Sequence, residues 1–375
     1  MPREHFKYFF TPKESTADLF FLPYWRFRGM VFSFDALSIE SKIIDTNILA
    51  LKPGSAPMSL GLRPQVLKLR YVAPGIAGNF LKPQFPFTKH INCGPANETS
   101  PIKPVSPGIE ASFVGETESL IYSPFSIHDN VLVDAVLQSP VGNAGGGLAE
   151  LPSERCDAED QLSFLPMMCP TCGWDLEGEK NSLVLFCHNC AIAWQSGGSG
   201  FENVNFAFPA AKNGGDAAIY LPFWRLNANV TGLQLRSYAD LVRLANLPRV
   251  VQREWERKQP HFWVPAFKIQ PHLFLRLSTS LTTLQPEPES NTPLSNSGIL
   301  PVTIPARKAL ESLKVLIASL VIPKKFIFPL LPALSFSMND QMLVYLRFCQ
   351  RGSELIQEDF NLSIQASAVS WGQLI

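Results

Sequence analysis

Residues 169–174 read CPTCGW, and residues 187–190 read CHNC. Each stretch carries two cysteines separated by two residues, and fourteen residues lie between Cys172 and Cys187 (187 − 172 − 1). Two such pairs can place four thiolates at the corners of a tetrahedron, the arrangement that Zn²⁺ prefers. The gap is one residue shorter than the usual range for this pattern. We therefore predict a metal site with the ligands Cys169, Cys172, Cys187 and Cys190.

The residues around the cysteines favour a small structural module. Gly173 allows a tight turn in which amide N–H groups point at the sulfurs, and residues 183–186 are typical of a short strand. Residues 163–196 resemble a zinc ribbon, and the resemblance implies a zinc ion held by the four cysteines. Ala191 stands where other zinc ribbons have glycine, so we expect a looser second turn. Because four cysteines complete the coordination shell, His188 is expected to be a surface residue.

Other uses of the four cysteines remain open at this point. The same thiolates would hold iron in a rubredoxin-like electron-transfer site, although rubredoxin-like sites usually have Cys-x-x-Cys-Gly at both ends and this chain has it at one. Two disulfides, or four unrelated thiols, are further alternatives. With four protein ligands a zinc site is closed and does not activate water. We therefore expect a structural metal whose binding adds on the order of 10 kcal/mol to folding.

Composition limits the classes of function. The chain has 375 residues, of which 46% are hydrophobic and 17% charged, and Lys+Arg and Asp+Glu are both 32. A neutral chain has no general attraction to phosphate. Between Cys169 and Trp194 one basic residue, Lys180, faces three acidic ones, Asp175, Glu177 and Glu179. We therefore regard nucleic-acid binding as a weaker alternative than protein binding.

The sequence also bears on location. Residues 1–8 are charged and carry no signal-peptide pattern, and the apolar run 315–334 is interrupted by Pro323 and two lysines, so it is not expected to span a membrane. The remaining cysteines, at 93, 156 and 349, are far apart. Zinc-bound and unpaired thiols indicate a reducing compartment, which we take to be the cytoplasm.

Two similar blocks suggest a duplicated chain. Residues 19–27 read LFFLPYWRF and residues 218–226 read AIYLPFWRL, at an offset of 199 (222 − 23). A second match pairs residues 61–69 with 262–269, and a third pairs residues 120–125 with 330–333. The repeated Trp-Arg pair is interpreted as a core anchor of each half or as an interface. The order of blocks predicts two related halves on either side of the metal-binding segment.

The expected architecture is a strand-rich α+β fold. The boundaries are a first β-rich half at 1–140, a flexible linker at 141–162, the zinc ribbon at 163–196, and a second β-rich half at 197–375 with a mobile loop at about 284–300. Gly29 is expected to turn residues 19–34 into a hairpin. Helices are expected at 237–244, 249–258 and 306–322, the last ending at Pro323.

No catalytic motif stands out from the sequence. The six histidines form no His-Glu-x-x-His pattern, and residues 142–147 (GNAGGG) lack the lysine of a phosphate loop. The pair His128 and Asp129 falls in an expected turn. The sequence therefore favours a non-catalytic zinc-binding protein that acts as an adaptor, accessory subunit or assembly factor of a protein complex, with no prediction of its oligomeric state.

Overall fold

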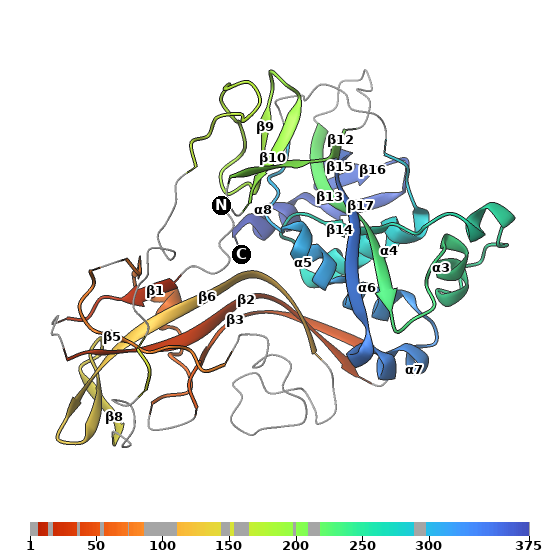
Figure 1. Ribbon diagram of the computed structural model, residues 1–375. Coiled ribbons are helices and arrows are strands. Elements are labelled where there is room, and N and C mark those ends of the chain that lie inside the picture. Colours follow the sequence, from red (N-terminus) through yellow and green to blue (C-terminus); the bar gives the residue numbers. More distant parts are fainter. Residues whose placement is uncertain are drawn as a thin grey trace.

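The described residues of the chain form three β-sheets and several helices, arranged as in Figure 1. The structure is a computed structural model, and it describes residues 7–13, 18–35, 38–52, 56–73, 75–85, 111–143, 151–153, 165–197, 200–208, 218–288 and 298–374. The expected strand-rich α+β class is confirmed.

The first sheet is built on two long antiparallel strands, β2 (Phe20–Asp35) and β6 (Ala111–His128). Strand β3 (Ser38–Leu49) lies along the other side of β2. The sheet is completed by β1 (Lys7–Phe10), β4 (Leu69–Tyr71), β5 (Asn79–Phe80), β7 (Val131–Asp134) and β8 (Ser139–Asn143).

The second sheet has the same kind of centre. Strands β13 (Ala218–Thr231) and β15 (Ser335–Arg351) form a long antiparallel pair, and β14 (Phe262–Pro265) lies along the other side of β13. The remaining strands are β12 (Phe206–Ala207), β16 (Glu354–Gln357) and β17 (Leu362–Gln365). In both sheets a short strand, β1 or β12, runs parallel to the second long strand.

Hydrogen bonds repeat at matching positions of the two sheets. Pro23 lies opposite Tyr122, and Pro222 lies opposite Tyr345. The amide of Ala50 donates to the carbonyl of Pro23 at 2.9 Å, and the amide of Ala266 donates to the carbonyl of Pro222 at 2.9 Å. We call residues that match in this way counterparts.

The Trp-Arg blocks lie on these counterpart strands, β2 and β13. Trp25 Nε1 donates to the carbonyl of Phe85 at 2.8 Å, and Trp224 Nε1 donates to the carbonyl of Ile304 at 2.7 Å. Trp224 is fully buried. A buried indole needs such an acceptor, so each tryptophan ties its central strand to a later segment of the chain.

Two of the three block matches were wrong. Residues 63–66 form the short helix α1 (Arg63–Val66), whereas the segment matched to it contains strand β14. Residues 328–333 form a 3₁₀ helix, η4 (Phe328–Ala333), and the strand that matches β6 is β15. Both matches had been aligned on a proline. Pro64 lies in the first turn of α1 and Pro332 lies inside η4, so neither proline belongs to a strand.

Gly29 does not make a turn. Strand β2 continues through it to Asp35, and the register against β6 shifts between Arg28 and Gly29, as at a β-bulge. The extended ends of β2 and β6 reach the second half, because Met30, Phe32, Phe34 and Val114 belong to the same buried cluster as the second sheet. The rings of Phe34 and Phe328 lie 5.7 Å apart.

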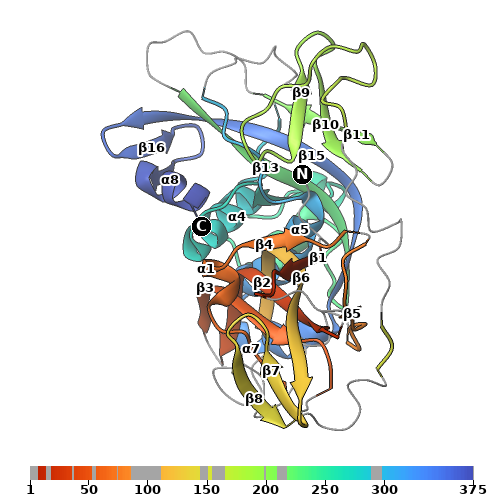
Figure 2. The same ribbon diagram turned by 90° about the vertical axis from the view of Figure 1, so that its left-hand side faces the viewer.

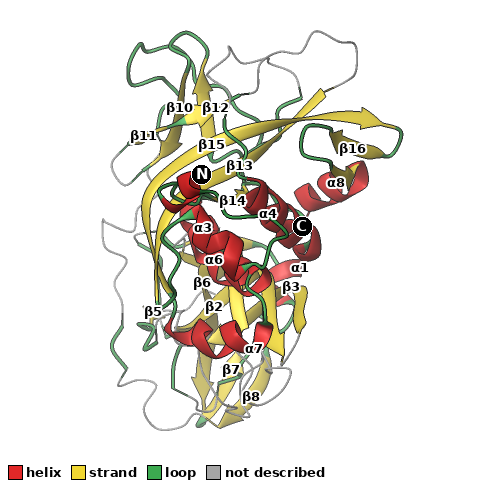
Figure 3. Cartoon of the chain, turned by 90° about the vertical axis from the view of Figure 1, so that its right-hand side faces the viewer, coloured by secondary structure: helices red, strands yellow, loops and turns green. Residues whose placement is uncertain are grey.

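Most of the helices lie in sequence between strands β13 and β15 of the second sheet. They are α3 (Tyr238–Leu244), η3 (Arg253–Glu256), α4 (Pro271–Leu284), α5 (Ala306–Glu311), α6 (Leu313–Leu320), α7 (Lys324–Ile327) and α8 (Ala366–Leu374). Helix α4 contacts β14 and β3 and lies between the two large sheets in Figure 3. Helix α5 contacts β6 and β15, so it also lies between them (Figure 2). None of the helices that the structure describes has the length and apolar character needed to cross a bilayer.

The expected helices were found in part. Ser237 caps α3 through a reciprocal pair of hydrogen bonds with Asp240, and the expected helix at 306–322 is present as α5 and α6. The segment 249–258 contains only the short η3. Helix α4 was not predicted, although Phe274, Leu277 and Leu281 have helical spacing and are buried.

Candidate metal centre

The four predicted cysteines come together. The Sγ atoms of these residues all lie within 4.8 Å of one another: Cys169, Cys172, Cys187 and Cys190. Those of Cys172 and Cys187 are 3.5 Å apart. A tetrahedron with metal–sulfur bonds of about 2.3 Å has edges of about 3.8 Å. The donor set and its spacing therefore fit a four-coordinate metal ion such as zinc or iron.

The first pair of cysteines is held by a tight turn. The amide of Cys169 donates to the carbonyl of Trp174 at 2.7 Å, and the amide of Gly173 donates to the carbonyl of Cys169 at 2.8 Å. Gly173 has a φ of 73°, a conformation that glycine adopts without strain. This turn brings Cys169 and Cys172 to the same side of the backbone.

The second pair follows a short strand, as predicted. Strand β9 (Val184–Cys187) pairs antiparallel with β10 (Ile192–Ser196), and the turn between them contains Cys190. Ala191 has a φ of 53°. It thus adopts the left-handed conformation of Gly173 without being a glycine, which costs about 1–2 kcal/mol. The second turn is formed at a cost in backbone strain.

The sulfur atoms strongly affect one another's ionisation. Hydrogen bonds, chiefly from the Asn189 side chain, lower the pKa of Cys172 to about 6. The neighbouring Cys172 and burial raise the pKa of Cys190 to about 12. Burial also raises the pKa of Cys187. Four thiolates in this space need a cation to balance their charge, as a metal ion does.

His188 lies outside the ligand set. It is exposed at the second turn, and its Nε2 lies 3.1 Å from the Glu177 carboxylate. The sequence prediction of a surface histidine agrees with this position. Beyond the four sulfurs, no other cluster of metal-ligating side chains was found among the described residues.

The metal-binding segment has two faces with different neighbours. One face forms its own small core from Cys169, Leu176, Cys187 and Trp194. The other face contributes Val184, Phe186, Ala193 and Val204 to the core of the second sheet. Phe186 contacts Phe206 and Tyr345, with ring centroids 5.5 and 6.0 Å apart. Figure 2 shows the segment above β13 and β15.

The backbone makes the same attachment. The amide of Leu183 donates to the carbonyl of Val302 at 2.7 Å. Strand β10 pairs antiparallel with β11 (Phe201–Val204), and the amide of Gly197 donates to the carbonyl of Gly200 at 2.7 Å. The three-stranded sheet therefore extends to Val204 and leads directly into β12.

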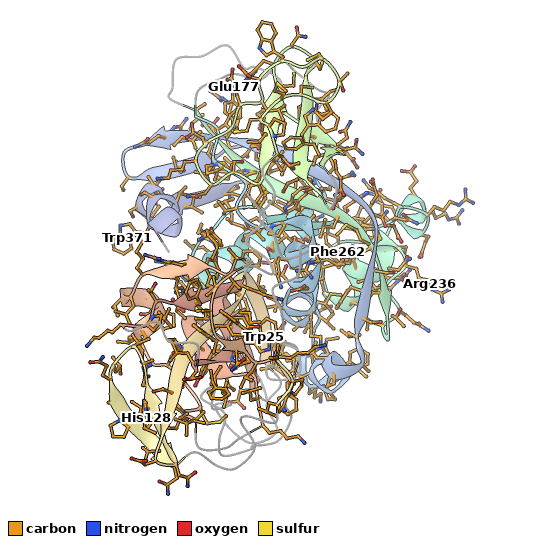
Figure 4. The ribbon with its side chains drawn as sticks, turned by 60° about the vertical axis from the view of Figure 1, so that its left-hand side comes forward. Trp25, His128, Glu177, Arg236, Phe262 and Trp371 are labelled. Atoms are coloured by element: carbon orange, nitrogen blue, oxygen red, sulfur yellow. The ribbon has the colours of Figure 1, made fainter. Side chains whose placement is uncertain are left out.

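The other sequence candidates lie elsewhere. His128 ends β6 and Asp129 follows it in a turn with a φ of 48°. Figure 4 shows His128 at the opposite end of the molecule from Glu177 of the metal-binding segment. Cys349 is buried in β15. Cys93, Cys156, residues 144–147, most of the expected linker and most of the expected mobile loop fall outside the described residues.

An apolar surface beside the first pair of cysteines was missed from the sequence. Met167, Met168 and Trp174 are 53%, 51% and 60% exposed. Met168 forms a β-bridge with Asp175, and the amide of Leu176 donates to the carbonyl of Met167 at 2.9 Å, so the backbones that carry these three side chains are paired beside the turn. The signal was visible as two methionines directly before CPTCGW, a position that the metal ligands do not explain.

Comparison of this chain with protein-family models, with curated proteins and with solved structures gave no match.

Proposed function

We propose that this protein is a non-catalytic, zinc-binding adaptor, accessory subunit or assembly factor of a protein complex, in a reducing compartment such as the cytoplasm. The observation that carries the proposal is the exposed apolar surface of Met167, Met168 and Trp174 beside a four-cysteine site. We call this surface the knuckle patch. Large apolar side chains that are exposed close together on neighbouring backbone segments are typical of sites of protein association.

The metal supports this function through structure. A tetrathiolate zinc site has no open coordination position, so its chemistry is to hold the two turns together. The metal-binding segment is too short to be stabilised by its own small core alone. In such segments metal binding supplies part of the free energy of folding. The knuckle patch is then presented on a rigid turn, which lowers the entropy cost of binding.

Charge indicates the kind of partner. Asp175, Glu177 and Glu179 follow the knuckle patch, and Lys180 is the basic residue of the same stretch. We infer that the partner surface is apolar with a basic rim, because complementary charge favours association and like charge opposes it. The acidic character of this segment also weighs against nucleic acid as the partner.

We further propose that the two large sheets arose by duplication and that the metal-binding segment was inserted between them. The matched indole bonds of Trp25 and Trp224 support this origin. So does the match of residues 120–134 (LIYSPFSIHDNVLVD) with 343–357 (LVYLRFCQRGSELIQ), at a single offset of 223. Two related halves form a broad framework on which the knuckle patch is mounted.

The test is affinity purification from the native source with a matched pair of variants. Trp174→Ala removes the largest side chain of the knuckle patch, and Trp371→Ala removes a tryptophan that is equally exposed, 61% against 60%, on helix α8. We expect Trp174→Ala to lose a stoichiometric partner that the wild type and Trp371→Ala retain. A wild-type protein that elutes as a monomer and retains no partner at native levels would contradict the proposal.

A further inference from the structure

Two residues paired across the second sheet carry buried N–H donors that find no acceptor in the part of the chain that the structure describes. Arg225 on β13 is directly opposite Trp263 on β14. Arg225 Nε and Trp263 Nε1 are both buried and have no hydrogen-bond partner among the described residues. The Trp263 side chain is fully buried, and that of Arg225 is 14% exposed. An unsatisfied buried donor costs about 1–3 kcal/mol, so this pair calls for an explanation.

The counterparts on the first sheet are fully satisfied. Arg26, the counterpart of Arg225, donates from Nε and NH2 to the two carboxylate oxygens of Asp45 at 2.8 and 2.5 Å, and from NH1 to the carbonyl of Pro64 at 3.1 Å. Asn47, opposite Arg26, donates to the carbonyl of Gly61 at 2.8 Å. The Asp45 carboxylate and the backbone carbonyls of Gly61 and Pro64 thus accept the hydrogen bonds of Arg26 and Asn47.

The second sheet has no carboxylate at the position that matches Asp45. Two residues before Trp263 stands His261, where Asp45 stands two residues before Asn47. His261 Nδ1 lies 3.2 Å from Arg225 NH2. Burial, followed by the charge of Arg225, lowers the pKa of His261 to about 4, so the imidazole is neutral near pH 7. It cannot balance the guanidinium charge or engage its fork of donors as a carboxylate does.

A single exposed carboxylate partly takes that place. Glu287, which follows α4, accepts from Arg225 NH2 at 3.3 Å and from Lys258 Nζ at 2.6 Å, and its side chain is 63% exposed. Glu287 also lines a cavity of about 70 Å³ together with Trp263, Val344, Gln357 and Phe360. The cavity therefore adjoins Trp263, and Glu287 lines it and also contacts Arg225.

We propose that Arg225 and Trp263 form a carboxylate-binding site in which Glu287 occupies the place of the ligand's carboxylate. A carboxylate is an acceptor-only group that matches the guanidinium fork in two parallel bonds, and the first sheet binds its own carboxylate on the counterpart arginine. The cavity beside Trp263 accepts a small apolar body attached to that group. The site is remote from the four cysteines and goes beyond the function proposed above.

The experiment measures carboxylate binding by NMR, with the indole N–H signal of Trp263 as the reporter, assigned through Trp263→Phe. Propionate is titrated against uncharged propionamide. Acetyl-glutamate amide and acetyl-glutamine amide are titrated in parallel, since the carboxylate can come from a free small molecule or from an acidic side chain of a protein. Binding of propionate points to the first source, and binding of the glutamate derivative alone points to the second.

Four variants decide the outcome. Glu287→Gln removes the competing carboxylate from an exposed position, so we expect an affinity for carboxylate about tenfold higher than in wild type. Glu358→Gln is the matched control: Glu358 lines the same cavity but pairs with Arg351, and no change is expected. His261→Asp places a carboxylate where the first sheet has Asp45, and Arg225→Met removes the cation. Both should abolish binding.

The proposal is overturned if neither wild type nor Glu287→Gln binds a carboxylate up to about 50 mM, a limit far above millimolar dissociation constants. It is equally overturned if the amides bind as well as the acids, or if His261→Asp binds carboxylate like wild type. Because Glu287 is exposed, Glu287→Gln is expected to fold normally, and it keeps the test valid even if Arg225→Met does not fold.

Discussion

The two large sheets share a central strand pair but bury it in different ways. In the first sheet, the loop that contains Ala56 and Leu60 packs on one face, and Arg63 pairs with the buried carboxylate of Asp134. In the second sheet, helix α4 lies against β14, and the counterpart of Asp134 is the neutral Gln357. The same strand framework thus carries a buried ion pair in one half and a neutral residue beside a cavity in the other.

Comparison of the two positions separates the features that both sheets share from those that occur in only one. Asp134 and Gln357 both cap the following turn: Asp134 Oδ1 accepts from the amide of Val136 at 2.9 Å, and Gln357 Oε1 accepts from the amide of Phe360 at 2.9 Å. The capping role is common to both sheets and the charge is not. The backbone framework is therefore shared by the two sheets, whereas the charged partners differ between them.

The largest expected effect is the loss of one metal ligand. Cys172→Ser should release the metal and with it on the order of 10 kcal/mol of binding energy. The metal-binding segment packs on the second sheet, so hydrogen exchange should accelerate over 184–204 and in β15 near Tyr345, while residues 120–125 of the first sheet stay protected. His188→Gln is the control, and it should keep the metal. Equal loss of protection in both sheets would contradict this asymmetry.

The second expected effect concerns the buried ion pair. Arg63→Met leaves Asp134, which is fully buried, without its partner, and should lower the free energy of unfolding by about 3–5 kcal/mol. Adding Asp134→Gln copies the second sheet and should recover part of that loss. Arg351→Met breaks an exposed pair with Glu358 and should cost less than about 1 kcal/mol. Urea unfolding measures all three, and equal losses for Arg63→Met and Arg351→Met would refute the prediction.

The third effect depends on pH. The pKa of histidine in an unfolded chain is near 6.5, whereas burial, followed by the charge of Arg225, lowers the pKa of His261 in the folded chain to about 4. The unfolded state therefore binds more protons between these values, and His261 lowers stability as the pH falls from 6.5 towards 4, with its full contribution present above 6.5. His261→Asp should remove this loss and stabilise the second sheet at pH 7 by about 1 kcal/mol. Unfolding curves measured at pH 7 and at pH 5 check this. The prediction is wrong if the free energy of unfolding falls by the same amount between these pH values in wild type and in His261→Asp.

The smallest effect applies the same comparison to the two cysteine turns. Gly173 and Ala191 both have positive φ, but only the first is a glycine. Ala191→Gly should raise the free energy of unfolding by roughly 1 kcal/mol, since relief of strain is reduced by the entropy of glycine. Gly173→Ala should lower it. Thermal unfolding of the two metal-loaded variants gives the sign, and a destabilised Ala191→Gly would contradict the account.

The clustering of the four cysteines could be predicted from the sequence because two Cys-x-x-Cys pairs impose their own geometry. The sequence also located the central strands β2 and β13 through the Leu-Pro-aromatic-Trp-Arg block, whose residues serve the same bonds in both sheets. The match of β6 with β15 was visible as Leu, Tyr and Phe at 120, 122 and 125 and at 343, 345 and 348. It was missed because Pro124 was aligned with Pro332 instead of Tyr122 with Tyr345.

Other features depend on contacts that a linear reading does not contain. The partner of Arg26 is Asp45, on a neighbouring strand, and nothing near Arg225 in sequence shows that the corresponding carboxylate is absent. The metal-binding segment attaches to the second sheet through Val184, Phe186 and Ala193. The alternation of side chains along their strands indicates that one face is buried but does not indicate which part of the protein covers it. Such pairings follow from the tertiary fold.

The central claim is a structural zinc ion held by four cysteines, and metal analysis of the native protein tests it most directly. We predict one zinc ion per chain in a colourless protein, with the metal lost in Cys190→Ser and retained in His188→Gln. A red protein with one iron per chain would instead indicate the electron-transfer alternative. Four free thiols, or two disulfides, in a protein without metal would contradict the claim itself.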